Sequence, residues 1–286
     1  MDFISKQKIK NLLKVRQIYP SKRLGQNFLI DKLAIKKFLK AVNLKSGDIV
    51  LEIGPGIGNL TGELAKKVRK VIAIEKDPKM INILKDTTKE FKNIKIIQGD
   101  ILKTNLKSKI LNLKSYKVVA NLPYYITAPA IRKFLESENH PEEMVLIIQK
   151  EVAQRICAKP PNMNLLAVSV QFYAKPEIIC YVSKKSFWPQ PKVDAAIIKI
   201  TPHKTVPHQC LRYGTGLHEQ FFEIVRSGFS QPRKQIVNNL TKMLKFNKEQ
   251  VNLWLLENNI QPQQRAETLN IKDWLNLAKT LNKYER

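Results

Sequence analysis

A series of short apolar segments alternating with helix-like segments constrains the fold of this chain more than any other feature. The apolar segments are "DIVLEI" (48–53), "KVIAIE" (70–75), "IKIIQGD" (94–100), "YKVVA" (116–120) and "EMVLIIQ" (143–149). Runs with so few polar interruptions are typical of parallel strands that are buried on both faces. Helical periodicity is found over residues 32–42, 59–68, 78–88 and 127–138. The alternation predicts an α/β fold with a doubly wound, Rossmann-like sheet.

The rest of the chain predicts further parts. Residues 176–182 and 193–200 are strand-like and could form an antiparallel pair that closes the sheet. Residues 1–23 contain seven Lys or Arg and one Asp, which indicates a basic N-terminal arm with a short helical piece. A stretch with two prolines and two glycines lies at residues 201–216, and only helical periodicity follows it. We therefore expect four parts, with the boundaries 1–23 for the arm, 24–202 for the sheet domain, 203–216 for a linker and 217–286 for a small helical domain.

The charge of the chain predicts its partner. Among 286 residues there are 50 Lys plus Arg and 24 Asp plus Glu, which gives a formal net charge of +26. So large an excess favours binding to nucleic-acid phosphates, because neutralising them releases counterions. No apolar run approaches membrane-spanning length, and the N-terminus has no secretory signature, so we expect a cytoplasmic protein. The three cysteines and four histidines form no CxxC or Cys/His cluster, so neither a disulfide framework nor a metal site is expected.

A glycine-rich loop follows the first strand. In "VLEIGPGIGNL" the glycines are Gly54, Gly56 and Gly58, and glycines at such a turn let the backbone approach a ligand closely. The G-x-G-x-G spacing differs from the dinucleotide fingerprint and from a P-loop.

Two acidic residues at the ends of neighbouring strands narrow the choice of ligand. Glu75 ends the second strand, 75 − 54 = 21 residues after Gly54, where a carboxylate can accept hydrogen bonds from ribose hydroxyls. Asp100 ends the third strand and could accept from an adenine amino group. Together with a loop that lacks the pyrophosphate pattern, these acids favour S-adenosylmethionine over NAD.

The sequence resembles one family of methyltransferases. The most specific matching stretches are "KRLGQNFLID" (22–31), "ANLPYYIT" (120–127) and "FWPQPKVDAAI" (187–197), supported by "IQKEVAQRI" (148–156) and "QPQQRAETL" (261–269). With these motifs the chain resembles the ribosomal RNA adenine dimethyltransferases of the KsgA type. The resemblance implies a Rossmann-like catalytic domain, a small helical RNA-binding domain and S-adenosylmethionine as methyl donor. It also implies N6,N6-dimethylation of two adjacent adenosines in the 3′-terminal hairpin loop of small-subunit rRNA and a role in small-subunit biogenesis. Nothing in the sequence demands more than a monomer, so we expect a monomer.

Carried over by motif, the resemblance implies the site residues. The cofactor-binding residues would be Asn27, Leu29, Gly54, Gly56, Glu75, Asp100 and Asn121. In "NLPYY", Asn121 and a backbone carbonyl near Leu122–Pro123 would accept the two N–H bonds of the target adenine amino group, and Pro123 would fix the local backbone. Tyr124 and Phe187 would stack on the two faces of the base, while Tyr125 is expected to be a packed core residue.

The RNA contacts are expected on the basic arm and on the helical domain. The residues are Lys22, Arg23, Arg226, Arg233 and Lys234. In "SQPRKQ" (230–235), Pro232 stands where the family usually has Arg, so one basic contact of the helical domain is missing from the pattern.

Three other functions compete with this interpretation. The first is an Erm-type methyltransferase that modifies a large-subunit adenine, which "NLPYYITAP" and "QRAETL" resemble less. The second is a non-catalytic RNA-binding assembly factor, against which the intact Gly54, Glu75, Asp100 and Asn121 argue. The third is a DNA adenine methylase, which usually has two prolines after its Asn or Asp, whereas this chain has Leu122–Pro123.

Overall fold

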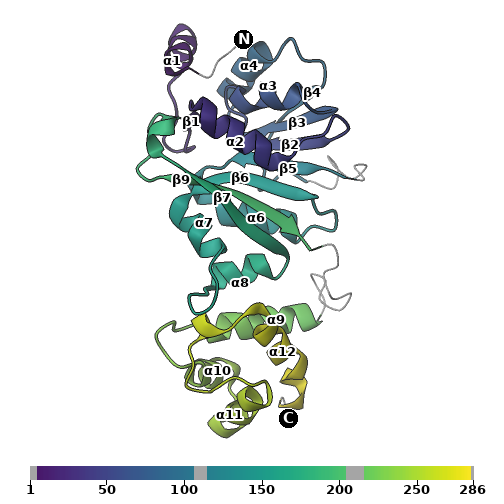
Figure 1. Ribbon diagram of the computed structural model, residues 1–286, viewed down its shortest axis with the longest axis vertical. Coiled ribbons are helices and arrows are strands. Elements are labelled where there is room, and N and C mark those ends of the chain that lie inside the picture. The colour runs from purple at the N-terminus through teal and green to yellow at the C-terminus, as the bar shows by residue number, and fades with distance from the viewer. Residues whose placement is uncertain (1–4, 106–114, 204–215, 285–286) are drawn as a thin grey trace. The chain divides into compact units, whose positions relative to one another are not determined.

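The computed structural model describes residues 5–105, 115–203 and 216–284, and the chain divides into two compact units (Figure 1). The first unit comprises Met1–Ala153 and Pro176–Pro202, and the second comprises Gln154–Lys175 and His203–Arg286. The segment 154–175 therefore groups with the C-terminal helices, although the sequence placed it in the sheet domain. Nearly all of the predicted linker, 204–215, lies outside the described residues, and the four predicted boundaries stay a prediction.

A seven-stranded sheet forms the centre of the first unit. Its strands are β2 (Ile49–Ile53), β3 (Lys70–Glu75), β4 (Ile94–Gln98), β5 (Lys117–Asn121), β6 (Glu143–Gln149), β7 (Ala174–Val182) and β9 (Ala195–Pro202). Their order is β4-β3-β2-β5-β6-β9-β7, in which the pairs from β4 to β6 are parallel and β6 pairs with β9 antiparallel. The doubly wound sheet is thus confirmed, and both late strands lie at one edge of it.

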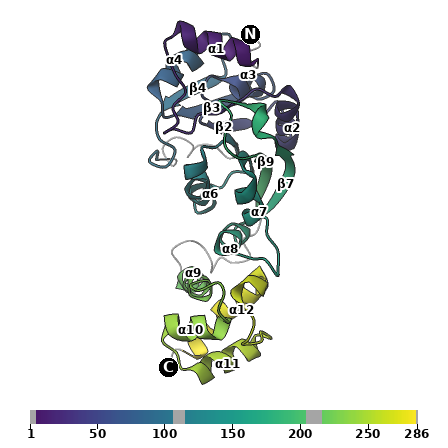
Figure 2. The ribbon, with the colours of Figure 1, turned by 90° about the vertical axis from the view of Figure 1, so that its left-hand side faces the viewer.

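The first five described helices of this unit form in the predicted places, and the sixth, over residues 150–156, was not predicted. They are α1 (Lys6–Val15), α2 (Lys32–Val42), α3 (Asn59–Ala65), α4 (Pro78–Thr87), α6 (Thr127–Leu135) and α7 (Lys150–Ile156). Asp31 and Asp77 cap the N-termini of α2 and α4 by accepting from backbone N–H groups. The apolar faces of α2 and α3 pack in one core cluster with β-strand residues such as Val50 and Val119. Figure 2 shows α6 on the opposite side of the sheet from α2.

The strand order creates one switch point in the sheet. From β2 the chain winds outward through β3 to β4 on one side, whereas β5 and β6 lie on the other side. The carboxyl ends of β2 and β5 are therefore adjacent, with Ile53 opposite Ala120 in the register. In open α/β sheets ligands bind in the crevice at such a point.

A second, two-stranded sheet was not predicted. β1 (Phe28–Leu29) pairs antiparallel with β8 (Phe187–Trp188), so that Phe28 lies opposite Trp188 and Leu29 opposite Phe187. Two segments far apart in the sequence, both of which carry motifs of the family resemblance, are thereby held together.

A buried lysine lies at the amino end of the central strand β5. Lys117 begins β5, and its ammonium donates to the carbonyl oxygens of Val42 (3.1 Å) and Asn43 (2.8 Å) at the end of α2. The same ammonium lies 3.0 Å from the Asp48 carboxylate and 3.4 Å from that of Glu143. With four acceptors around it, the charge is buried but compensated.

The second unit consists mainly of helices, as predicted for residues 217–286, whereas its helix within 154–175 was not predicted. They are α8 (Leu165–Gln171), α9 (Gly216–Gly228), α10 (Ile236–Leu244), α11 (Lys248–Glu257) and α12 (Ile271–Thr280). Aromatic rings join α8 to α9: the Phe172 and Phe221 centroids lie 4.3 Å apart, and the Tyr173 hydroxyl lies 2.6 Å from His218 Nε2.

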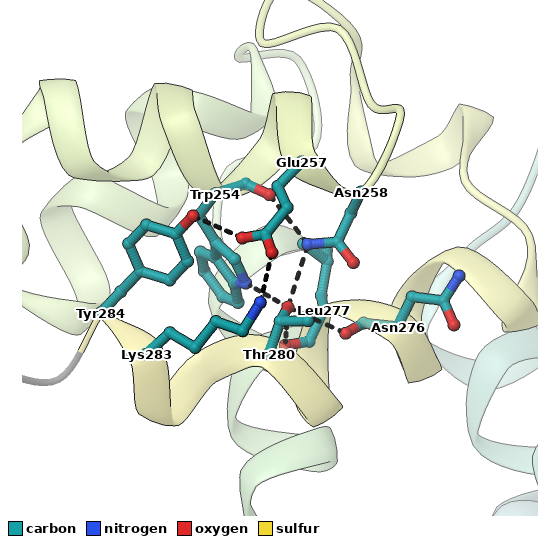
Figure 3. A network of polar contacts seen from close by, with 8 residues as sticks. All are labelled: Trp254, Glu257, Asn258, Asn276, Leu277, Thr280, Lys283 and Tyr284. Atoms are coloured by element: carbon teal, nitrogen blue, oxygen red, sulfur yellow. Dashed lines mark hydrogen bonds and ion pairs between the residues drawn. The ribbon is translucent and has the colours of Figure 1, made fainter.

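Polar contacts join α11 to α12 at the other end of this unit (Figure 3). The Thr280 hydroxyl accepts from Trp254 Nε1 and from Asn258 Nδ2, each at 2.9 Å, and it donates to the Asn276 carbonyl at 3.0 Å. One hydroxyl therefore satisfies the indole of a tryptophan that is fully buried.

None of the described helices has the length and apolar content needed to span a bilayer.

Candidate active site

A pocket lies at the switch point of the sheet, beyond the carboxyl ends of β2 to β5. Its wall is formed by the loop after β2, the ends of β3 and β4, the turn after β5, and residues 24–29. The pocket contains most of the residues that the sequence predicted for the site: Asn27, Leu29, Gly54, Gly56, Glu75, Asp100, Asn121 and Pro123.

The glycine loop turns where the expected ligand would lie. Gly54 and Gly56 have φ of +64° and +58°, a region that residues with side chains rarely adopt. A Cβ at Gly54 would have no atom within 4 Å, so the space above it is open. A Cβ at Gly56 would lie 3.0 Å from the ring of Phe28, so the loop is closely packed on that side.

Glu75 is held by backbone groups on both of its oxygens. Gly56 N–H donates to Oε2 at 3.0 Å, and Asp77 N–H donates to Oε1 at 2.8 Å. Burial raises the pKa of Glu75, and these two hydrogen bonds oppose that increase. Because each carboxylate oxygen has a second lone pair, Glu75 can still accept from a ligand hydroxyl while its position stays fixed.

Asp100 is the more accessible of the two predicted acids. Leu102 N–H donates to Oδ1 at 3.0 Å, and the Lys76 ammonium lies 2.9 Å from Oδ2. The hydrogen bond from Lys76 lowers the pKa of Asp100, so the carboxyl is ionised at neutral pH and can accept from an amino group.

Asn121 and Asn27 are linked across the pocket. The Asn121 amide nitrogen donates to the Asn27 carbonyl at 2.8 Å, and the Asn27 amide donates to the Gly25 carbonyl at 3.2 Å. Because a carbonyl can only accept, the first contact fixes which end of the Asn121 amide is the nitrogen. The Asn121 oxygen is therefore directed away from Asn27 and stays able to accept.

The loop of residues 22–27 packs directly on the turn after β5. A Cβ at Gly25 would lie 3.1 Å from Pro123 Cβ, so only a glycine fits there with its φ of +63°. The Leu29 carbonyl accepts from Asn59 Nδ2 at 2.9 Å, which ties β1 to the start of α3. Sequence spacing alone gave no reason to place Asn27 and Leu29 here, because they precede the first strand of the sheet.

The structure assigns different places to the aromatic residues than the sequence did. Tyr124 is half-buried, and Tyr125, which was expected to be packed, is 56% exposed and lines the pocket instead. The expectation for Tyr125 was wrong because Tyr124–Ile126 form a 3-10 turn, in which neighbouring side chains point in different directions.

Phe187 does not fit the stacking role that was predicted for it. Its side chain is only 4% exposed and packs in the core cluster that contains Leu29 and Phe38, while its backbone pairs with Leu29 in the small sheet. The ring is covered in this structure, and its contacts are those of a core residue.

The predicted RNA-binding residues are all exposed. Lys22 and Arg23 immediately precede the pocket residue Leu24, and Arg23 is close enough to Lys76 to act on its charge. Arg226, Arg233 and Lys234 are exposed on the second unit. Contact between these five residues and RNA stays a prediction.

Glu52 is a pocket residue that the sequence analysis missed. It is 2% exposed, and its Oε2 atom has no hydrogen-bond partner. Burial raises the pKa of Glu52 to about 8, and the charge of Glu75 adds to the effect while Thr61 opposes it. The available signal was one acid within an apolar strand, directly before the glycine loop. Among the described residues no group of three or more His, Cys, Asp or Glu side chains could hold a metal ion.

The chain is similar in sequence to rRNA-modifying enzymes over almost its whole length. A family model described as ribosomal RNA adenine dimethylase matches residues 20–283. "Ribosomal RNA small subunit methyltransferase A" of Dehalococcoides mccartyi strain 195 is 42% identical over 253 residues, which cover 88% of this chain and 85% of that protein. The protein of the same name from Geobacillus kaustophilus is 39% identical over 269 residues, covering 91% and 90%.

Solved structures are also similar to this chain over almost its whole length. A dimethyladenosine transferase from Plasmodium falciparum superposes with a TM-score of 0.73 at 28% identity, covering 89% of this chain and 97% of that one. The 23S rRNA methyltransferase ErmE superposes with a TM-score of 0.72 at 25% identity, covering 90% and 100%. Since the family match includes both units and every predicted pocket residue, this chain belongs to the ribosomal RNA adenine dimethylase family.

Proposed function

We propose that this chain transfers methyl groups from S-adenosylmethionine to N6 of two adjacent adenosines in the 3′-terminal hairpin loop of small-subunit rRNA. The observation that carries the proposal is the position of Asn121. It ends β5 at the switch point, its amide nitrogen is fixed by the Asn27 carbonyl, and its oxygen is left to accept from an adenine amino group.

The pocket fits the proposed methyl donor. Open space above Gly54 accommodates a ligand close to the backbone. Glu75 is placed for ribose hydroxyls, and Asp100 for an adenine amino group. Two buried polar atoms, Glu52 Oε2 and Asn59 Oδ1, lack partners although both residues line the pocket. When bound there, S-adenosylmethionine would supply an electrophilic methyl group.

The protein contributes acceptors that are already in position. An adenine amino group is a weak nucleophile because its lone pair is delocalised into the ring. Two acceptors, one for each N–H bond, favour a pyramidal nitrogen with a localised lone pair. The first is Asn121 Oδ1. For the second we propose the Leu122 carbonyl; the Pro123 carbonyl already accepts one hydrogen bond, from Ile126 N–H at 3.1 Å.

Proline and tyrosine complete the substrate side of the site. Pro123 has φ of −55°, which its ring fixes, so the backbone of the turn is held in place before the substrate arrives. Burial raises the pKa of Tyr124, and the nearby Glu151 and Asp194 carboxylates add to the effect. Its phenol therefore stays neutral and is suited to stack on a base, a contact worth about 1–3 kcal/mol.

The proposed reaction needs no general base. With the methyl donor bound, the nitrogen lone pair would form the new N–C bond as the methyl group left sulfur, and the resulting cationic nitrogen would lose a proton to water. Positioning then provides most of the rate acceleration. The monomethylated amine keeps one N–H and a lone pair, so a second transfer can follow by the same route.

Methyl transfer to both ribosomal subunits tests the proposal. Labelled S-adenosylmethionine would be incubated with unmodified small- and large-subunit particles, and the digested RNA would be examined by mass spectrometry. We expect N6,N6-dimethyladenosine in the small-subunit 3′ hairpin alone, and its loss in Asn121→Ala with RNA binding retained. Wild-type turnover by Asn121→Ala would refute the role of Asn121.

The near-equal similarity to ErmE favours one alternative, methylation of a large-subunit adenine. Label in the large-subunit particle would establish it. Binding without any label would instead favour a non-catalytic assembly factor. We further propose that the chain acts as a monomer in the cytoplasm, where its substrate particles are assembled.

A further inference from the structure

Helix α1 is packed against the back of the proposed cofactor pocket. Ile9 and Leu13, on one face of the helix, are 0% and 2% exposed. They belong to an apolar cluster with Phe28 and Ile57, and both of these residues also line the pocket. The position of α1 therefore helps to determine the position of the pocket wall.

Two contacts from other side chains hold α1 in place. Arg16, which follows the helix, forms an ion pair with Asp86 of α4, and Figure 2 shows α1 beside α4. The Lys10 ammonium lies 5.9 Å from the ring centroid of Trp188 in β8, within the range of a cation–π interaction. The helix thus contacts both α4 and the small sheet of β1 and β8.

The other face of α1 is basic. Lys6, Lys10 and Lys14 are exposed, and the sequence contains no acidic residue between Asp2 and Asp31. Tyr19, shortly after the helix, is 88% exposed. Exposed cations with an exposed aromatic ring suit RNA, because phosphates bind the cations and a base can stack on the ring. The family match begins at residue 20, so α1 lies outside it.

We propose that α1 binds phosphates of the substrate RNA, and that its apolar face couples this binding to occupancy of the cofactor pocket. The inference rests on the function proposed above. RNA bound to the lysines of α1 stabilises the docked helix, and the docked helix supports Phe28 and Ile57. By linkage, a bound cofactor must then strengthen RNA binding by the same factor.

Close packing makes the coupling physically reasonable. The Phe28 ring lies 3.0 Å from the position of a Cβ on Gly56, so the ring and the glycine loop have no space between them. If α1 leaves, Phe28 and Ile57 lose part of their cover, and the loop loses its support. Packed interiors transmit such displacements because they contain few voids.

Charge reversal on α1 tests the RNA contact. Binding of a synthetic RNA hairpin, with the sequence of the small-subunit 3′ end, would be measured for the full chain and for Lys6→Glu/Lys14→Glu. We expect binding at least about tenfold weaker at moderate salt, and a salt slope smaller by about 2. Lys36→Glu/Lys40→Glu on α2 is the matched control, because it makes the same charge change on exposed lysines of the same unit. Its RNA affinity should stay within about twofold of wild type.

Cofactor binding tests the coupling. The dissociation constant of S-adenosylhomocysteine would be measured with and without the hairpin. We expect the hairpin to lower this dissociation constant several-fold in the wild-type chain. It should not do so in Leu13→Ala, because that substitution weakens the docking of α1. If Leu13→Ala unfolds, Ile9→Val is a milder second variant. It should reduce, but not abolish, the effect of the hairpin on the affinity for S-adenosylhomocysteine.

The outcomes separate the two proposals. If the wild-type chain methylates small-subunit RNA and the two double variants bind the hairpin with equal affinity, the proposed role of α1 is refuted, but the proposed function is not. A hairpin that binds but leaves the affinity for S-adenosylhomocysteine unchanged would refute the coupling. A wild-type chain that neither binds nor methylates small-subunit RNA would refute the proposed function, and the inference with it.

Discussion

Replacing Glu52 by Gln should stabilise the protein, by an amount that increases with pH. Glu52 is buried, one of its oxygens has no partner, and burial raises its pKa from 4.5 to about 8. A shift of that size corresponds to roughly 5 kcal/mol between the charged and the neutral form. Glutamine has nearly the same shape and never ionises, so it avoids this cost.

The direction of the effect follows from proton binding. Between pH 4.5 and about 8, Glu52 keeps its proton in the folded chain and loses it in the unfolded chain. The unfolded state thus binds fewer protons, and the free energy of unfolding falls by about 1.4 kcal/mol per pH unit across this window. Below this pH window, wild type and Glu52→Gln should differ little in their free energy of unfolding. Above the window, the difference between them should stay constant.

Urea unfolding at several pH values measures this effect. We expect the stability advantage of Glu52→Gln to grow by roughly 3 kcal/mol from about pH 5.5 to about pH 8. Glu223→Gln, the same change at an exposed acid of the second unit, serves as the control and should show no such growth. Parallel pH profiles for wild type and Glu52→Gln would show that Glu52 is not protonated in the folded chain.

Three other substitutions test separate parts of the structure. Gly56→Ala should weaken S-adenosylhomocysteine binding about tenfold in calorimetry, because φ of +58° costs a residue with a Cβ about 1–2 kcal/mol and the new methyl group would contact Phe28. Unchanged affinity would contradict the close packing there. Lys117→Met should destabilise the chain by about 3 kcal/mol in urea unfolding, because the Asp48 carboxylate loses its cation and the Val42 and Asn43 carbonyls lose their donor, while Glu143 keeps its ion pair with Lys199. A loss below about 1 kcal/mol would show that water replaces the ammonium. Thr280→Val should cost about 1–3 kcal/mol, seen as faster hydrogen exchange in α11 and α12, because the Trp254 indole loses its acceptor. Unaltered exchange would contradict this role.

The sheet could be predicted from the sequence because its signal is local and repeated. Each of β2 to β6 is an apolar run of the right length, and the helices between them show their own periodicity. The positions of Glu75 and Asp100 followed from the same rule, since parallel strands place their carboxyl ends at one edge. These inferences needed no knowledge of which distant segments touch.

The features that escaped prediction depend on such distant contacts. The pairing of β1 with β8 joins segments about 160 residues apart with only two residues each, too short to leave a periodic pattern. The burial of Phe187 follows from that pairing. Tyr124 and Tyr125 are chemically similar neighbours, and only the 3-10 turn decides which ring is exposed.

The discontinuous second unit also has a consequence for synthesis. Residues 154–175 leave the ribosome long before residues 216–284, which complete the same unit. Until then Phe172 and Tyr173 lack the ring of Phe221 and the imidazole of His218. A nascent chain can complete the β2–β6 part of its sheet early, but it presents two uncovered aromatic residues until the last helices have formed. Chains terminated early, near residue 203, should therefore aggregate or recruit chaperones through these residues, and Phe172→Ser should reduce that tendency.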